Sequence, residues 1–367
     1  MTYRQRYRIL LAVGSILLAA GCAHTIPEHP VNVDTITIAQ EPVRNAAGAV
    51  FDSGAVVWGG TIGQLDAARQ IADGWIVPTA ADRPPVRTAP GPIAARSRHV
   101  AAAHAGLVYL WGGSNGGTVF ADGAVLDPRT NTWQPIPPAP VGLASAQAIV
   151  QGDRIIIGGG ADSSGRNGNL ILIYDTQRKT WTSIDAHVTV LAFAASPDRI
   201  VTVARGTDNR TLQLGRFRHD QPAEPQFAVL RPGLLISDNI AVTDDGTTIT
   251  VAVSDHDTTK VYRLDPNGQP DRQADFDAAA FTPGLGTRTE TSRTVRDGDN
   301  WLAIDSYYVH GFSIGRFTGT GMWQLDACRD AATWIPLGDK RFLRYGGQPC
   351  GGDVPRSTQP VLAIIRL

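Results

Sequence analysis

Lysine, methionine and cysteine are scarce in this chain of 367 residues. Three of its 33 basic residues are lysines, and it contains only two methionines and three cysteines. So few methionines argue against a soft, methionine-rich binding surface. The 33 basic residues are balanced by 34 acidic ones, and no basic stripe is visible along the chain. This balance excludes the pattern that is typical of nucleic-acid-binding proteins.

Several catalytic and metal-binding motifs are also absent. The chain has no Gly-x-Ser-x-Gly elbow, no phosphate-binding glycine loop and no cysteine-rich metal site. His99 and His104 belong to one expected strand and face opposite sides of it, so they cannot share a metal ion. The segment 162–169 lacks the spacing and the terminal Glu of a calcium loop. We therefore expect neither a cofactor nor a metal.

Glycine and proline are frequent instead, with 39 and 24 copies respectively. This composition suits a fold with many turns and short strands. Hydrophobic residues make up 43% of the chain and charged residues 18%. A chain of this size and composition can bury a full hydrophobic core in one large domain or two ordinary ones.

The first residues have the pattern of an export signal. Arginines at positions 4, 6 and 8 precede an apolar run of twelve residues, 9–20. The run is too short to span about 30 Å of hydrocarbon, which favours a cleaved signal peptide over a permanent helix. It ends in Leu-Ala-Ala-Gly-Cys at 18–22. This ending resembles the lipobox of bacterial lipoproteins, although that family prefers Leu where Ala19 stands here.

The lipobox resemblance implies that residues 1–21 are removed and that Cys22 carries a diacylglycerol and palmitate. Residues 22–30 would then be a tether to the membrane. The protein would be exported and held in the cell envelope, at the outer membrane or the cell membrane, on the periplasmic or extracellular face. The alternative is an ordinary secretory signal in which Cys22 is incidental.

The remaining cysteines follow from this assignment. If Cys22 carries lipid, Cys328 and Cys350 are left as one pair in an oxidising compartment, where we expect a disulfide rather than two free thiols. In the chain-entropy model such a bond contributes about 3 kcal/mol to stability.

A unit of about 48 residues recurs along the chain. In its clearest copy a hydrophobic segment ends in the glycine pair 112–113, and Trp133 follows a second segment and a short turn. The next copy has its glycine pair at 158–159 and its tryptophan at Trp181. The position of the glycine pair recurs near residues 59, 112, 158, 205, 254, 305 and 346.

These units resemble the kelch repeat, in which each unit is one blade of a β-propeller. The resemblance implies an all-β fold in which residues 31–367 form one propeller. Seven repeat positions predict seven blades, with six or eight as alternatives. The glycine pairs would allow close backbone approach, and Trp133 and Trp181 would pack between blades.

The two ends of the predicted propeller contain strands without a blade of their own. The apolar run 361–367 looks like a third strand with nothing after it, and 33–38 is a single strand near the N-terminus. Pairing the two would complete the last blade from both ends of the chain.

In kelch-like propellers the ligand usually lies at one end of the central axis. The loops around it lead into each first strand and follow each second strand. Arg98, Arg205, Asp238, Asp255 and Asp305 are the candidate ligand-binding residues that the resemblance gives in these loops, since arginines and carboxylates suit an anionic or sugar-like ligand. The other loop residues carried over are Arg96, Ser114, Asn115, 162–169, Asn239, 255–257, 288–293 and 305–308. For each residue the alternative is a solvated loop end.

Clear repeats without a catalytic signature favour a monomeric, non-enzymatic binding or scaffold module for a protein or glycan at the envelope. The alternative is a carbohydrate-active enzyme, such as a sialic-acid mutarotase-like epimerase or a lyase. In that case Glu290 would act as acid and base, and Arg288 or Arg293 would hold a carboxylate. The known mutarotases resemble a six-bladed design, whereas seven units are counted here.

Overall fold

The structure is a computed structural model that describes most of the chain after residue 27. The described residues are 28–63, 65–79, 83–164, 168–206, 208, 210–218, 226–230, 240–254, 258–277, 293–297, 300–304, 308–313, 318–324, 329–349 and 361–367. Apart from one 3-10 turn, η1 (Leu65–Ala67), every regular element in these ranges is a β-strand. None of the described residues forms a helix long and apolar enough to cross a membrane.

The first three sheets follow the chain in antiparallel order. The first contains β3 (Ala47–Phe51), β4 (Gly54–Trp58), β7 (Gly74–Pro78) and β8 (Val86–Arg87). The second contains β9 (Val100–His104), β10 (Leu107–Trp111), β13 (Gly123–Asp127) and β14 (Thr132–Ile136). The third contains β15 (Gln147–Gln151), β16 (Arg154–Gly158), β17 (Leu170–Asp175) and β18 (Thr180–Asp185).

The later part of the chain continues in the same way. The fourth sheet contains β19 (Val190–Ala195), β20 (Arg199–Arg205), β21 (Leu212–Arg218) and β22 (Gln226–Leu230). The fifth contains β23 (Ile240–Asp244), β24 (Ile249–Ser254), β25 (Thr258–Leu264) and β26 (Pro270–Asp277). The sixth contains β27 (Arg293–Asp297), β28 (Asn300–Ile304), β29 (Tyr308–Ser313), β30 (Thr318–Gln324) and, on its edge, β1 (Glu28–Pro30).

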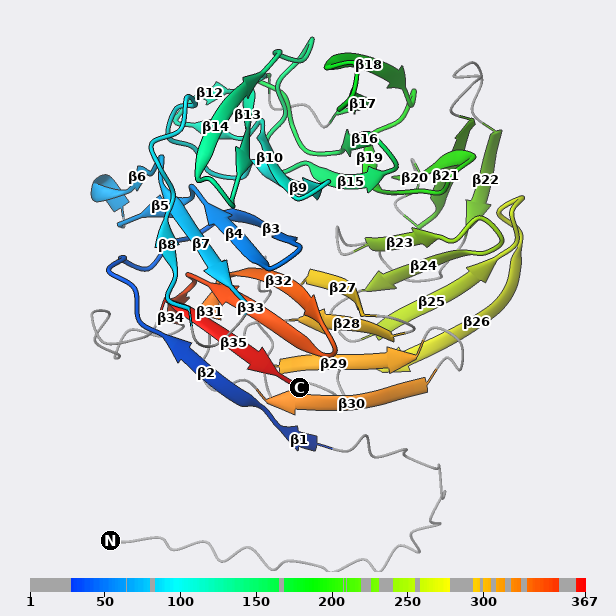
Figure 1. The fold of residues 1–367 in the computed structure, drawn as a ribbon. Helices are drawn as coiled ribbons and strands as arrows, with labels where there is room; N and C mark the ends of the chain where they lie inside the picture. The colour runs from blue at the N-terminus through cyan, green and yellow to red at the C-terminus, as the bar shows by residue number, and fades with distance from the viewer. Residues whose placement is uncertain are drawn as a thin grey trace, which may run out of the picture.

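The last sheet combines both ends of the chain. It contains β32 (Thr333–Gly338), β33 (Arg341–Tyr345), β35 (Leu362–Arg366) and β2 (Asn32–Ile36), with β2 antiparallel to β35. These are the two segments whose pairing the sequence predicts. Three two-stranded sheets lie outside the large sheets: β5 (Thr61–Ile62) with β6 (Arg69–Gln70), β11 (Ser114–Asn115) with β12 (Thr118–Val119), and β31 (Arg329–Asp330) with β34 (Gln348–Pro349). Figure 1 shows the large sheets side by side around a common centre, the arrangement of a β-propeller.

The segment 22–30, predicted as a tether, is partly structured. Residues 28–30 form β1, which pairs in parallel with β30 and so supplies backbone partners to the edge of the sixth sheet. The tether therefore stays a prediction, and residues 28–30 of the segment pair with the sixth sheet.

The second strand of each sheet ends where the repeat predicts a glycine pair. β4 ends at Trp58, β10 at Trp111 and β33 at Tyr345, and two glycines follow each of them. At Gly112 the backbone has a φ of 70°, and an added Cβ would lie 2.5 Å from the carbonyl oxygen of Leu143. The structural interpretation of these glycines is confirmed, because the conformation and the space both require glycine.

One glycine pair is shifted by one residue from its prediction. After β16 the two glycines with positive φ are Gly159 and Gly160, whereas Gly158 is the last residue of β16. Gly158 thus stands where the first, second and last sheets have an aromatic residue, and Phe193 of the next sheet lies against this position. Because residues 158–160 are all glycine, the sequence pattern does not show which two of them follow the strand.

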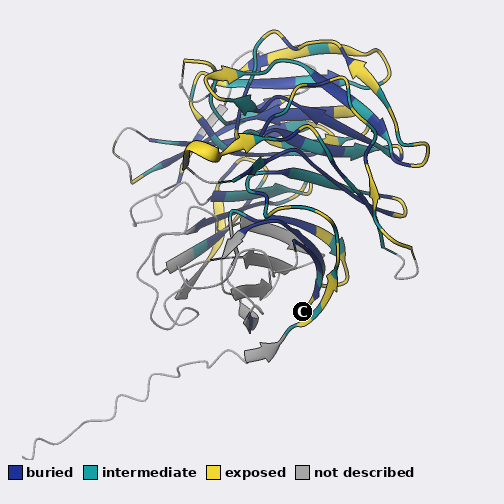
Figure 2. Ribbon diagram, turned by 90° about the vertical axis from the view of Figure 1, so that its left-hand side faces the viewer, coloured by how far each residue is buried: buried dark blue, intermediate teal, exposed yellow. Residues whose placement is uncertain are grey.

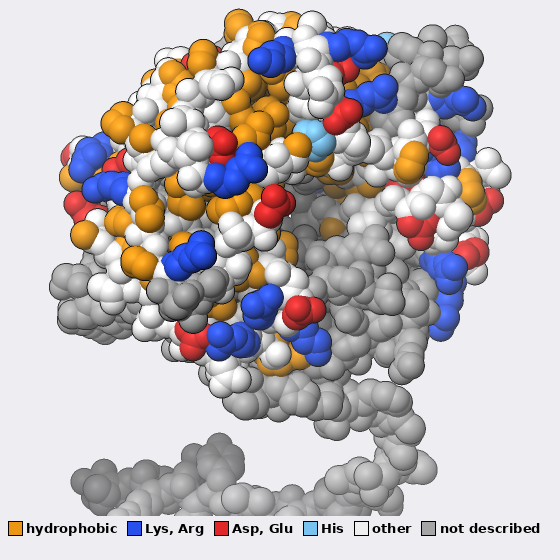
Figure 3. Space-filling view, in the orientation of Figure 1, with side chains coloured by type: hydrophobic (Ala, Val, Ile, Leu, Met, Phe, Trp, Pro, Cys, Tyr) orange, Lys and Arg blue, Asp and Glu red, His pale blue; other side chains and the backbone are white. Residues whose placement is uncertain are grey.

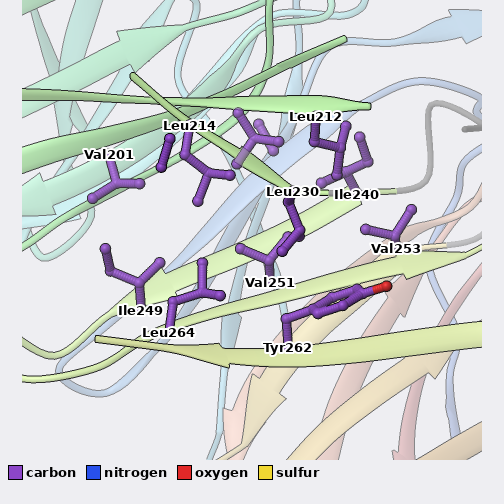
Figure 4. Close-up of a cluster of buried hydrophobic side chains, with 13 residues drawn as sticks. Val201, Leu212, Leu214, Leu230, Ile240, Ile249, Val251, Val253, Tyr262 and Leu264 are labelled. Atoms are coloured by element: carbon purple, nitrogen blue, oxygen red, sulfur yellow. The ribbon is translucent and has the colours of Figure 1, made fainter. Parts of the chain in front are cut away.

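The hydrophobic core is divided into layers between neighbouring sheets. Alternate residues of one strand face opposite sides, so Val56 and Trp58 pack toward the second sheet while Ala55 and Val57 pack toward the seventh. Figure 4 shows the layer between the fourth and fifth sheets, where Leu212, Leu214 and their neighbours meet side chains such as Val251. Each fully buried aliphatic side chain contributes about 1.5–3 kcal/mol. Figure 2 shows burial concentrated in the middle of the sheets.

The tryptophans of the fourth strands join adjacent sheets, as predicted. The ring of Trp133 lies 6.1 Å from that of Trp58, and its Nε1–H donates to the carbonyl of Ala89 at 2.9 Å. Trp181 has the same role one sheet later, with its ring 5.3 Å from Trp111. These contacts account for both residues as packing groups.

Candidate functional site

Strand register places the predicted ligand loops on one face of the sheets. Ala47 pairs with Trp58, Val100 with Trp111 and Gln147 with Gly158. The start of each first strand therefore lies beside the end of each second strand. We call the side that carries these loops the loop face; the turns around Asp153 and Lys179 lie on the opposite face.

A chain of backbone hydrogen bonds connects four sheets at the loop face. The N–H of Asn45 donates to Ala331 at 3.3 Å, that of Arg98 to Asn45 at 2.9 Å, and that of Ser145 to Arg98 at 2.8 Å. Each of these residues stands two positions before the first strand of its sheet. The bonds hold the loops of the seventh, first, second and third sheets in fixed positions relative to one another.

All four residues of this chain of bonds have left-handed backbone conformations. Their φ values are 55° at Ala331, 53° at Asn45, 57° at Arg98 and 58° at Ser145. Asn tolerates this region well, whereas residues such as Arg are uncommon there. The left-handed conformation recurs at this position of the repeat whatever the residue type. The presence of Arg at position 98 is therefore not explained by a preference of Arg for this conformation.

Arg98 and Arg205 are the two described members of the five candidate ligand-binding residues, and Arg98 is the exposed one. Its side chain is exposed, and no partner for its guanidinium occurs within the described residues. An Arg held by its own backbone, with an unengaged planar head, is suited to bind a carboxylate or a backbone carbonyl of a ligand.

Arg96, two residues earlier, is not exposed at the loop face. It is fully buried, and its Nη1 donates to the carbonyl of Gly112 at 3.0 Å and to a carboxylate oxygen of Asp122 at 2.8 Å. Its guanidinium also lies over the ring of Phe120, 4.1 Å from the centroid. The expectation that Arg96 lines a ligand site is wrong, because its donors hold the second sheet's own loops together.

Other predicted loop residues mostly make local contacts. Asn115 belongs to the hairpin of β11 and donates to Ala95 at 3.0 Å, and Ser114 forms a bridge with Ser97. Asp162 accepts hydrogen bonds from the backbone and hydroxyl of Ser164 at 2.8 and 2.6 Å. These contacts shape the loop face without leaving a reactive group. Arg205 ends β20, is partly buried and has interaction partners.

Most of the remaining predicted residues lie outside the described residues. Arg293 begins β27, and its side chain is not described. Those that lie outside the described residues are Cys22, Asp238, Asn239, Asp255, His256, Asp257, Arg288, Glu290, Asp305, Cys328 and Cys350. No group of three or more His, Cys, Asp or Glu side chains suited to a metal occurs in the described part of the chain.

His99 lies directly beneath the loop face. It is 5% exposed and contacts the edge of Trp58, with ring centroids 5.4 Å apart. Burial, with a smaller contribution from the positive charge of Arg96, lowers its pKa from 6.5 to about 3. His99 is therefore a neutral packing residue at physiological pH, and His104, at the other end of β9, pairs instead with Asp153 at 3.1 Å.

Figure 3 shows one face of the molecule, with a hollow at the centre of the sheets and acidic, basic and hydrophobic side chains at its edge. The geometry combines a rigid backbone scaffold with a mixed surface. Sequence patterns did not reveal Ala331, Asn45 and Ser145 as members of the scaffold, because the three share a backbone conformation but no residue type.

Comparison with known proteins gives a matching family model and similar solved structures. Residues 32–199 match the family described as the KLHDC2/KLHL20/DRC7 Kelch-repeats domain. A structure titled "Structure of YjhT" is similar with 13% identity over 87% of this chain and 94% of that chain, at a TM-score of 0.49. No curated protein matches the sequence. The family match and the sheets themselves support kelch repeats in a β-propeller.

Proposed function

We propose that this protein is an exported, lipid-anchored kelch-type propeller of seven blades that binds a protein partner at its loop face. The observation that carries the proposal is Arg98: an exposed cation, without a partner among the described residues, on a hydrogen-bonded scaffold of the matched kelch repeats. Arg is enriched at protein interfaces, and a scaffold that is rigid before binding reduces the entropy lost on association.

The number of blades is supported by the sheets of the described residues. Six of these sheets have four strands and one has five, and β2 pairs with β35. In a closed ring, the N-terminal and C-terminal strands of the last blade act as a clasp, because separating the neighbouring blades requires breaking their ladder.

Export and anchoring are supported by the lipobox-like end of the apolar run before Cys22. Replacing this cysteine with alanine is expected to release the protein from the membrane fraction, and mass spectrometry of the wild-type N-terminal peptide is expected to show an added diacylglycerol. A variant that stays in the membrane fraction, or a wild-type peptide without lipid, would refute the anchor.

The binding proposal can be tested by site-specific photo-crosslinking in intact cells. A photoreactive amino acid is placed at Arg98 or, as the control, at Lys179. Both residues are exposed cations with a φ of 57°, but Lys179 lies on the opposite face. We expect a discrete protein adduct from position 98 only.

The crosslinked partner is then identified and purified, and its affinity is measured for Arg98→Ala and Lys179→Ala. Loss of one charge-assisted hydrogen bond is expected to weaken binding by roughly tenfold or more in the first variant alone. Equal adducts from the two positions, no adduct from position 98, or equal affinities would contradict the proposal.

A further inference from the structure

A short backbone bridge recurs at the loop face of the first three sheets. In each sheet, the residue three positions before the first strand pairs with the residue that follows the two positive-φ glycines after the second strand. The two residues of a pair exchange both backbone hydrogen bonds. The pairs are Arg44 with Thr61, Ser97 with Ser114, and Ala144 with Ala161.

In the seventh sheet the same bridge is longer. Asp330 pairs with Gln348 at the positions of the repeat, and Arg329 pairs with Pro349 one step further, which together form the sheet of β31 and β34. Because the first pair corresponds to a hydrogen-bonded pair of the other sheets, the alternation of an antiparallel ladder makes the second a non-hydrogen-bonded pair. A proline has no N–H to donate, so Pro349 costs no ladder bond at this position.

The next position of this ladder has a cysteine on each strand. Cys328 precedes Arg329 and Cys350 follows Pro349, and both cysteines lie outside the described residues. If the register of β31 and β34 continues by one residue, the two cysteines are direct cross-strand partners in a hydrogen-bonded pair. The Cα atoms of such a pair are about 5.5 Å apart, within the roughly 4.4–6.8 Å that a disulfide spans.

We infer that Cys328 and Cys350 form a cross-strand disulfide that closes the bridge of the seventh sheet and fixes the Ala331 end of the hydrogen-bonded scaffold at the loop face. This inference rests on the proposed export, because disulfides persist in oxidising compartments.

The position of Ala331 explains why the scaffold needs such a link. Ala331 directly follows β31, and its carbonyl accepts the N–H of Asn45 at 3.3 Å. This is the longest of the three bonds that join the scaffold residues, since the other two measure 2.9 and 2.8 Å. A covalent bond at Cys328, three residues before Ala331, limits how far the longest bond can open.

Formation of the bond requires a disulfide donor, such as oxidised glutathione or the disulfide of a thiol oxidoreductase. The thiolate of one cysteine attacks a donor sulfur, the donor S–S bond breaks, and one donor thiolate leaves. The second cysteine then attacks the mixed disulfide and releases the other donor sulfur as a thiol. Two protein thiols are oxidised, one donor disulfide is reduced, and the two thiol protons end on the donor.

The bond is tested on the mature protein purified from membranes. Free thiols are alkylated before digestion, and the peptides are analysed by mass spectrometry with and without reduction. A linked pair of peptides that contain Cys328 and Cys350 is expected in the wild type and in Cys22→Ala, and no link is expected in Cys328→Ser.

The same analysis separates this inference from the proposed export. Alkylated thiols at both positions in a protein whose Cys22 carries lipid, or a bond from either cysteine to Cys22, would overturn the inference and leave the export proposal intact. If the protein proves not to be exported, the reduced protein is treated with oxidised glutathione. Formation of the Cys328–Cys350 bond then supports the register, and its failure to form overturns it.

The effect on the scaffold is measured by residue-resolved hydrogen exchange of the oxidised protein, the reduced protein and the Cys328→Ser/Cys350→Ser variant. The matched control is the N–H of Ser145, which stands at the same repeat position as Asn45 but donates to Arg98 at the other end of the scaffold. Loss of the disulfide is expected to speed exchange of the Asn45 N–H roughly tenfold or more and to leave that of Ser145 unchanged. Equal exchange at Asn45 with and without the bond, or equal acceleration at both residues, would refute the local role of the disulfide.

Discussion

The buried His99 predicts a specific loss of stability in acid. Its ring lies between the glycine pairs of two sheets: a Cβ added at Gly59 or at Gly113 would lie 2.7 Å from His99 atoms. Neither ring nitrogen has a hydrogen-bond partner within the described residues. Protonation would place an unpaired charge in this layer, close to the guanidinium of Arg96.

The size of the effect follows from proton linkage. The pKa of His99 is about 3 in the folded state and 6.5 for an unperturbed histidine. Because the folded pKa is the lower one, the unfolded chain binds the proton more readily. The contribution of His99 to stability is complete above pH 6.5 and falls with pH until about pH 3. The loss is about 2 kcal/mol at pH 5 and about 3 kcal/mol at pH 4.

The assay is chemical denaturation of the wild type, His99→Gln and His104→Gln between pH 7 and pH 4. Carboxylates titrate in all three proteins, so the differences between the curves isolate each histidine. The wild type and His104→Gln are expected to lose about 2 kcal/mol more than His99→Gln between pH 7 and pH 5. Parallel curves for wild type and His99→Gln would refute the assignment of a depressed pKa to His99.

Four further perturbations test the fold. Deleting 361–367 removes β35, which pairs on both sides with β33 and β2, and no soluble, protease-resistant protein is expected. Gly112→Ala is expected to cost about 3 kcal/mol or more in chemical denaturation, because a Cβ there meets backbone. Gly152→Ala has a positive φ but nothing within 4 Å, and is expected to cost only about 1 kcal/mol. Trp133→Phe removes one hydrogen bond to the first sheet and is expected to cost about 1 kcal/mol in the same assay. Equal costs at the two glycines, or a folded truncation, would contradict this account of the repeats.

Repeat periodicity was sufficient to predict the second strands, because the same physical demand recurs in each sheet. Each strand must bury both faces and then turn sharply, and apolar residues followed by glycine meet both needs. The error at Gly158 shows the limit: where the strand itself ends in glycine, only packing against Phe193 distinguishes strand from turn.

The pocket that Gln40, Asp73 and Val361 line, beside the connection from β2 to β3, could not have been predicted in this way. Gln40, Asp73 and Val361 come from three segments, two of which meet only because the chain ends share one sheet. None of these residues belongs to a repeating pattern, and their types are common. What distinguishes Gln40 and Asp73 is an unpartnered oxygen in a buried place, and this is a property of the folded molecule alone.

Arg96 and Arg98 look alike in the sequence, but the backbone places them in different surroundings, one buried and one exposed. Ser97, between them, bridges to Ser114 with hydrogen bonds of 3.0 and 2.9 Å, which anchors the loop to the end of β10. Arg96 lies on the inner side of this anchor, where the carbonyl of Gly112 and the carboxylate of Asp122 take up its donors. Arg98 lies beyond it, where the left-handed backbone sends both its N–H and its carbonyl to neighbouring loops. Because the N–H and the carbonyl of Arg98 are both hydrogen-bonded, only its side chain can contact a ligand. The hydrogen-bonded backbone fixes where that side chain begins. The same argument predicts that, in the proposed interface at the loop face, the residue types at positions such as 45, 98 and 145 decide which partner is bound, while the backbone beneath them stays the same.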